Sequence, residues 1–168
     1  MKAAVSLVAL GLVVVWSGAA FAADQTDKIV AEMKKCAVCK NLAEKPELLK
    51  NMGWETHKID NGMLTLTTVP EDMKKDFDEV SEKMHRSIEQ VTADAKQGKK
   101  VELCSFCSSM GELMKLGAKH QHIETKTGAV DMMTSDNPET VKKIHEVADK
   151  AIAMQKQIAE SRRTASLR

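Results

Sequence analysis

The amino-acid sequence predicts an α+β domain in which a helix–β-hairpin–helix unit is duplicated. The two hairpins are expected to pair in one four-stranded antiparallel sheet packed with helices. The strongest observation is a C-x-x-C motif that occurs twice, at Cys36–Cys39 and at Cys104–Cys107, 68 positions apart. Each motif is followed by two strand-like runs around a glycine turn, and each hairpin by a long amphipathic segment. A duplication of this kind predicts an approximate internal two-fold axis between the units.

Other short matches share the 68-residue offset, which strengthens the case for duplication. The Pro-Glu and Lys-Lys dipeptides recur at this offset, at residues 70–71 and 138–139 and at residues 74–75 and 142–143. We therefore expect a single mature domain over residues 23–160, made of repeats at about 27–96 and 101–160. The basic segment 161–168 is expected to be a flexible tail.

Helical spacing of apolar residues predicts two helices in each unit. The first helix of each unit carries the cysteines, over residues 27–51 and 101–116. Pro46 predicts a break or kink within the first of them, because proline has no N–H for the helical hydrogen bond. The second helix of each unit is long and amphipathic, over residues 71–96 and 139–160.

Turn residues define the hairpins between these helices. Asn61-Gly62 is a strong signal for a two-residue hairpin turn, because both residues tolerate positive φ. It predicts strands at residues 54–60 and 63–69, where threonine and valine favour extended backbone. The second hairpin has the same plan, with strands and turn at residues 119–125, 126–128 and 129–134. A single hairpin is marginally stable in water, so we expect the two to pair.

The N-terminus has the pattern of a cleavable secretory signal peptide, residues 1–22. Lys2 provides a positive start, residues 3–16 form an uncharged apolar run, and Ala20-Phe21-Ala22 fits the small-x-small cleavage rule. The apolar run is short for a bilayer span of about 20 residues. We therefore expect a periplasmic or secreted protein with no permanent membrane anchor after cleavage.

The charge balance argues against a nucleic-acid partner. The chain has 25 basic and 24 acidic residues, and cleavage removes only Lys2, which leaves 24 of each. A nucleic-acid-binding domain would show a basic excess. Aromatic residues after the signal are limited to Trp54, Phe77 and Phe106, which is little surface for stacking on bases or sugars. The sequence identifies no protein partner.

The paired cysteines are the chief chemical constellation of the chain. Positions i and i+3 of a helix share a face, so each motif can direct both sulfurs the same way. If the two motifs meet across the two-fold axis, four thiolates converge in the number that suits tetrahedral zinc. Copper(I) or an iron–sulfur cluster is also chemically possible. The predicted ligands are Cys36, Cys39, Cys104 and Cys107, and the weaker candidates are the hairpin histidines His57, His120 and His122.

Two other uses of the cysteines stay open. Exported proteins meet an oxidising compartment, where structural disulfides form. A bridge between the units, closing about 70 residues, would stabilise by about 4.4 kcal/mol, against about 2 kcal/mol within one motif. Thiol–disulfide exchange is less favoured, because a redox C-x-x-C normally begins a helix, whereas residues 27–35 predict helix before Cys36. Lys40 and Ser108 stand where c-type haem attachment needs histidine, so no c-type haem is expected.

Together these patterns predict an exported, non-enzymatic binding or structural module. Its paired cysteines hold a soft metal ion, with zinc as the first candidate, or structural disulfides. The alternative is a periplasmic thiol–disulfide oxidoreductase or a redox-sensing protein. The chain contains no G-x-S-x-G, H-E-x-x-H or phosphate-binding glycine motif, so the sequence gives no support to a hydrolase.

Overall fold

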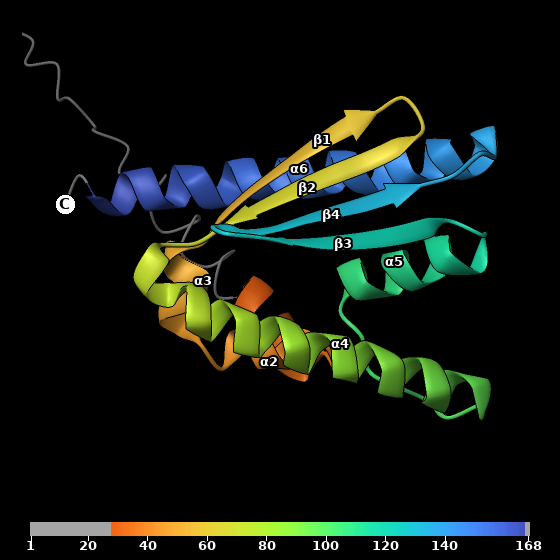
Figure 1. Ribbon diagram of the computed structural model, residues 1–168, viewed down its shortest axis with the longest axis horizontal. Coiled ribbons are helices and arrows are strands. Elements are labelled where there is room, and N and C mark those ends of the chain that lie inside the picture. The colour runs from red at the N-terminus through yellow and green to blue at the C-terminus, as the bar shows by residue number, and fades with distance from the viewer. Residues whose placement is uncertain (1–27, 167–168) are drawn as a thin grey trace, which may run out of the picture.

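The fold is α+β, as the sequence predicts, with helices packed on one four-stranded antiparallel sheet (Figure 1). The computed structural model describes residues 28–166, and the side chains of residues 28–160. The strands lie in the order β1-β2-β4-β3, so the two hairpins meet through β2 and β4 at the centre of the sheet. The predicted signal peptide, residues 1–22, lies outside the described residues.

The two hairpins have the same length and the same pairing register. Their strands are β1 Gly53–Ile59, β2 Gly62–Thr68, β3 Lys119–Thr125 and β4 Gly128–Thr134. In each hairpin the first residue of one strand faces the last residue of the other, as Gly53 faces Thr68. Between the hairpins, β2 and β4 pair around Thr65 and Asp131. The predicted strands are confirmed to within one residue. The first turn is Asp60-Asn61 and not Asn61-Gly62 as predicted, because Ile59 pairs with Gly62, which already belongs to β2. A shared origin of the two halves and a two-fold axis between them stay predictions.

Two glycines allow β2 and β4 to approach closely. A Cβ atom on Gly62 would overlap the backbone carbonyl of Met133, and one on Gly128 would overlap that of Thr67. Gly128 also has a φ of +146°, a backbone conformation that residues with a side chain rarely adopt. Each central strand therefore begins with glycine because the neighbouring strand leaves no room for a side chain.

Helices precede and follow each hairpin. In the first half, residues 28–35 are helical, and the other elements are α2 Lys40–Ala43, α3 Pro46–Asn51, the short 3-10 helix η1 Glu71–Met73 and α4 Lys74–Lys96. In the second half they are α5 Ser105–Lys115 and α6 Pro138–Ser166. The helix α6 therefore continues past residue 160, into the segment that the sequence predicts to be a flexible tail.

The cysteine-bearing helices are shorter than the sequence predicts. The expected helix over residues 27–51 is interrupted at residues 36–39 by a turn, and again before Pro46, which begins α3 and confirms the predicted break. The expected helix over residues 101–116 begins only at Ser105. Both differences lie at the cysteines, so the two C-x-x-C motifs occupy helix ends and turns instead of helix interiors.

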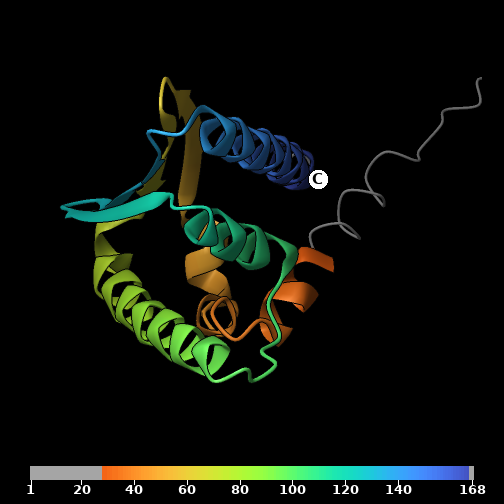
Figure 2. The same cartoon turned by 90° about the vertical axis from the view of Figure 1, so that its right-hand side faces the viewer.

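The helices cover one face of the sheet (Figure 2), and the apolar side chains between the layers form two clusters. The first cluster joins Phe77 and Val80 of α4 to the segment before β1 and to Ala129 of β4. The second cluster consists of side chains from α5, α6, β2 and β4 and the residue before β3: Met63, Leu113, Ala118, Met133, Ile144, Val147 and Ala148. The two clusters pack against different cross-strand rows of residues on the same face of the sheet: the first against Ala129, and the second against Met63 and Met133.

A row of polar side chains crosses the helix-facing side of the sheet between these clusters. Thr56, Thr65, Asp131 and His122 stand directly opposite one another on the four successive strands. We call these four residues the polar row. Hydrogen bonds link Thr56 Oγ1 to Thr65 Oγ1 at 3.1 Å and His122 Nδ1 to Asp131 Oδ1 at 2.9 Å. At one end, Gln155 of α6 donates to Thr56 Oγ1 at 2.7 Å, which satisfies that buried hydroxyl.

Candidate metal centre

The first cysteine pair lies in the turn between the helical residues 28–35 and α2. The N–H of Ala37 donates to the carbonyl oxygen of Glu102 at 2.9 Å instead of continuing the helix. The helical pattern resumes when Lys40 N–H donates to the Cys36 carbonyl at 3.1 Å. The prediction that this pair lies within a helix was therefore wrong. A contact from the other half of the chain holds the turn in place, and local sequence patterns do not reveal such a contact.

The second cysteine pair begins α5. Cys104 is the N-cap residue, with extended backbone at φ −67° and ψ 165°, and its carbonyl accepts the first helical bond from Ser108 N–H at 2.9 Å. Cys107 lies in the first helical turn, so both sulfurs are near the helix N-terminus. The partial positive charge at that end of a helix favours thiolate over thiol.

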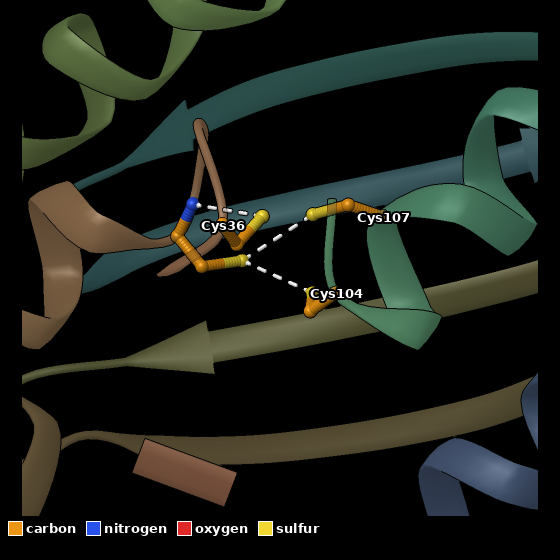
Figure 3. A group of neighbouring side chains, drawn as sticks. Cys36, Cys104 and Cys107 are labelled. Atoms are coloured by element: carbon orange, nitrogen blue, oxygen red, sulfur yellow. Dashed lines mark hydrogen bonds between the residues drawn. The ribbon is translucent and has the colours of Figure 1, made fainter. Parts of the chain in front are cut away.

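The structure brings all four cysteines together, as the sequence predicts. Figure 3 shows the sulfurs of Cys36, Cys104 and Cys107 directed toward a common centre. The sulfur of Cys39 belongs to the same group. The four Sγ atoms lie within 4.8 Å of one another. Cys39 Sγ lies 3.3 Å from Cys107 Sγ and 3.7 Å from Cys104 Sγ. In a zinc site with Zn–S bonds of about 2.3 Å, tetrahedral geometry separates the sulfurs by about 3.8 Å.

The cysteines are free thiols in this arrangement. All four belong to the described part of the chain, and none of them forms a disulfide. The shortest of the two sulfur–sulfur distances given above, 3.3 Å, is far longer than a disulfide bond of about 2.05 Å. The disulfide interpretation is therefore not the state that the structure shows.

One side of the cluster is sealed and another side is open. Cys36 is fully buried, with 0% of its surface exposed, whereas Cys104 is only partly buried. A surface depression of about 230 Å³ reaches the cysteines beside Cys104. Its lining consists of Glu32, Lys35, Cys36, Glu102, Leu103, Cys104 and Ser105. An ion or a reagent from solvent can reach the cluster along this side.

Hydrogen bonds among the sulfurs separate the pKa values of the thiols. The bonds from Cys107 and then from Cys39 lower the pKa of Cys104. The hydrogen bond to Cys104 is the main cause that raises the pKa of Cys39, and it also raises that of Cys107. Among the four thiols, Cys104 is therefore the one whose pKa these contacts lower. A metal ion would displace the thiol protons, as metal binding to thiols does.

This donor set suits a single soft ion. Four sulfur ligands in tetrahedral arrangement are characteristic of zinc or iron–sulfur sites. A cubane cluster places iron and sulfide between its cysteine sulfurs and so holds them farther apart than one ion does. Since all four sulfurs lie within 4.8 Å, the geometry favours one ion over such a cluster. The backbone N–H of Cys39, 3.5 Å from Cys36 Sγ, adds a donor that stabilises negative charge on sulfur.

The three candidate histidines do not join the cysteines. Within the described residues, the group of three or more side chains placed to hold one metal ion contains the four cysteines and no histidine. His57 lies beside Glu55, with Nε2 3.0 Å from its carboxylate. His120 and His122 both contact the carboxylate of Asp131, at 3.1 and 2.9 Å. The strand alternation correctly placed these two histidines on one face, but that face presents them to Asp131.

Access along the depression leads to a chemical prediction. N-ethylmaleimide added to the metal-free native protein should modify Cys104 before Cys36, because Cys104 is partly exposed and has a lowered pKa, whereas Cys36 has no exposed surface. Peptide mass spectrometry over a time course measures the order, and zinc added first should protect all four cysteines. Modification of Cys36 ahead of Cys104 would contradict the described access.

These features define the class of protein: a small α+β domain with a four-cysteine cluster at the ends of its helices. Comparison with protein-family models, with curated proteins and with solved structures found no match to this chain. No helix in residues 28–166 is long and apolar enough to cross a membrane.

Proposed function

We propose that this protein is an exported, non-enzymatic module that binds one zinc ion through Cys36, Cys39, Cys104 and Cys107. The observation that carries the proposal is the convergence of four free thiols, from two segments far apart in the chain, within 4.8 Å. Four protein ligands complete the coordination of zinc and leave no position for a substrate, which is the pattern of structural zinc sites.

The position of the cluster supports a structural role for the ion. Cys39 packs against the first apolar cluster, and the helix α5 that begins after Cys104 contributes Leu113 to the second. An ion held by both cysteine pairs would therefore connect the two halves of the helical layer. Small domains commonly gain folding free energy from such an ion, because a preformed site rarely exists in the unfolded chain.

Metal analysis of the protein purified from its native compartment tests the proposal. We expect about one zinc per chain and four thiols that become titratable only after chelation or denaturation. Cobalt(II) substituted for zinc should show the intense thiolate-to-metal absorption of a four-sulfur tetrahedral site. Intact mass should correspond to a chain that begins at Ala23, if residues 1–22 are a signal peptide. Two disulfides with no metal would contradict the zinc site, and retained residues 1–22 in the membrane fraction would contradict export.

A second candidate, thiol–disulfide exchange, is favoured by Cys104. This cysteine N-caps α5, has a lowered pKa, and borders the surface depression, as a redox-active C-x-x-C motif requires. The two functions differ in a simple assay. An oxidoreductase turns over a dithiol substrate in the presence of a disulfide oxidant, whereas a zinc module with four coordinated thiolates does not.

A further inference from the structure

His122 has an unusual environment for a histidine at the midpoint of an edge strand. Its Nδ1 lies 2.9 Å from Asp131 Oδ1, and its Nε2 is buried. Among the described residues, this Nε2 is the buried side-chain nitrogen or oxygen that lacks a hydrogen-bond partner. Buried polar atoms normally have a partner, so an orphaned nitrogen calls for a bound water, ion or ligand.

The carboxylate of Asp131 determines which nitrogen of the ring carries the proton. A carboxylate accepts hydrogen bonds, so Nδ1 of His122 carries the N–H and Nε2 keeps a free lone pair. This carboxylate–histidine arrangement is the one that holds metal-binding histidines in place, because it fixes both the tautomer and the orientation of the ring. Asp131 also contacts His120 Nε2 at 3.1 Å, which anchors the carboxylate from a second side.

A second imidazole lies next to His122. The ring of His85, an exposed residue of α4, is edge-to-face with the ring of His122, with centroids 4.7 Å apart and planes at 82°. Two imidazoles that share one ion with bonds of about 2.0–2.1 Å hold their ring centroids about 5 Å apart. The observed separation is close to this value. Because His85 is exposed, its ring can turn to bind an ion without disturbing the core.

We propose that His85 and His122 bind a divalent transition-metal ion of the imidazole-preferring class, such as nickel, copper(II) or zinc, at a site separate from the cysteine cluster. Asp131 is a positioning residue that acts through His122. Water completes the coordination, as in open metal sites. Imidazole ligands suit these ions, whereas thiolate ligands select softer ones, so the two sites differ in preference. The site uses the α4–β3 contact and does not depend on whether the cysteines hold zinc.

Calorimetric titration of the full mature chain with nickel, after a single equivalent of zinc has been loaded on the cysteine cluster and excess zinc removed, tests the site. We expect one additional equivalent of nickel. That equivalent should be lost in His122→Ala and in His85→Ala, and its affinity should fall 10–100-fold in Asp131→Asn, the usual effect of removing a carboxylate that orients a metal-binding histidine. The matched control is His57→Ala, since His57 lies on β1 beside Glu55, and nickel binding should be unchanged in it.

Two readouts keep the outcome decisive. Each variant should retain its zinc and its thermal melting profile, which separates loss of the histidine site from loss of the fold. Copper(II) bound at the site should show nitrogen ligation by electron paramagnetic resonance and no thiolate charge-transfer band, which separates it from binding at the cysteines. Absence of an additional equivalent in the native chain would overturn the proposal, as would undiminished binding in the His85→Ala, His122→Ala double variant. If the cysteine cluster does not retain zinc, the proposed zinc module is contradicted. The copper(II) measurement then decides whether His85 and His122 bind a metal ion.

Discussion

Replacing Cys36 and Cys104 together by serine should abolish tight zinc binding and lower the Tm of the zinc-saturated protein by about 10–20 °C. Zinc at a thousandfold excess over its Kd adds about 4 kcal/mol to the free energy of unfolding. For domains of this size range, 1 kcal/mol corresponds to about 2–8 °C in Tm. The double variant removes one ligand from each pair, so neither half of the site can hold the ion alone. Differential scanning calorimetry with and without zinc measures the change.

The difference between the zinc-loaded and chelated Tm is the informative quantity for this pair of cysteines. This difference should be large in the native chain and near zero in the double variant, which cannot hold the ion. Serine in place of buried Cys36 also changes the Tm of the metal-free protein. Comparing each protein with its own chelated form removes that contribution. An unchanged zinc content in the double variant would exclude these cysteines as the ligands.

Substitution of Gly62 by alanine should destabilise the protein by about 3 kcal/mol or more, among the larger effects seen for single substitutions. The added Cβ would overlap the backbone carbonyl of Met133 on β4, and backbone cannot move aside as a flexible side chain can. The two central strands must therefore separate locally, with loss of ladder hydrogen bonds. Urea denaturation followed by circular dichroism measures the free energy of unfolding.

Gly111 provides the matched control for this glycine substitution. It lies within α5, and a Cβ atom there meets nothing within 4 Å. Alanine at this position should stabilise the protein by about 0.5–1 kcal/mol, since glycine is unfavourable in a helix interior. Equal effects of Gly62→Ala and Gly111→Ala would show that the close approach of β2 and β4 does not limit the sheet.

Local signals explain why the sheet could be predicted from sequence. The Asn61-Gly62 dipeptide locates the first hairpin to within one residue, since the turn is Asp60-Asn61 and Gly62 begins β2. The alternation of side chains then determines which residues face the helices. The second hairpin follows the same rules without an Asn-Gly turn, and its strand bounds agree within one residue with those expected. Turn chemistry and period-2 alternation act within a few residues, so a single sequence contains them.

The details of the cysteine site depend on contacts that no local pattern contains. Helical spacing in residues 27–51 continues through Cys36, yet the chain turns there because Ala37 N–H bonds the carbonyl of Glu102. The start of α5 at Ser105, directly after the N-cap residue Cys104, was likewise not predicted by helical spacing. The equal spacing of the two motifs predicted that the sulfurs meet. It did not predict that they meet at helix ends.

The contact between His85 and His122 could not be predicted from the sequence either. Their separation in the chain gives no periodic signal, because one residue lies on α4 and the other on β3. What the sequence does contain is the alternation of His120 and His122 on one strand face. The partner on that face, Asp131, lies on the neighbouring strand, and its position opposite His122 follows from the hairpin register.

The polar row has a consequence for how the domain unfolds in part. It separates two apolar clusters, so the side-chain packing of one can be lost while the other persists. Proteins divided in this way open in cooperative sub-global units, each with its own free energy and its own level of amide hydrogen-exchange protection. The covalent chain and the sheet connect the two units on one side, and the four cysteines connect them on the other. An ion bound by those cysteines would thus act as a cross-link between two folding units, raising the cooperativity of unfolding as well as its free energy.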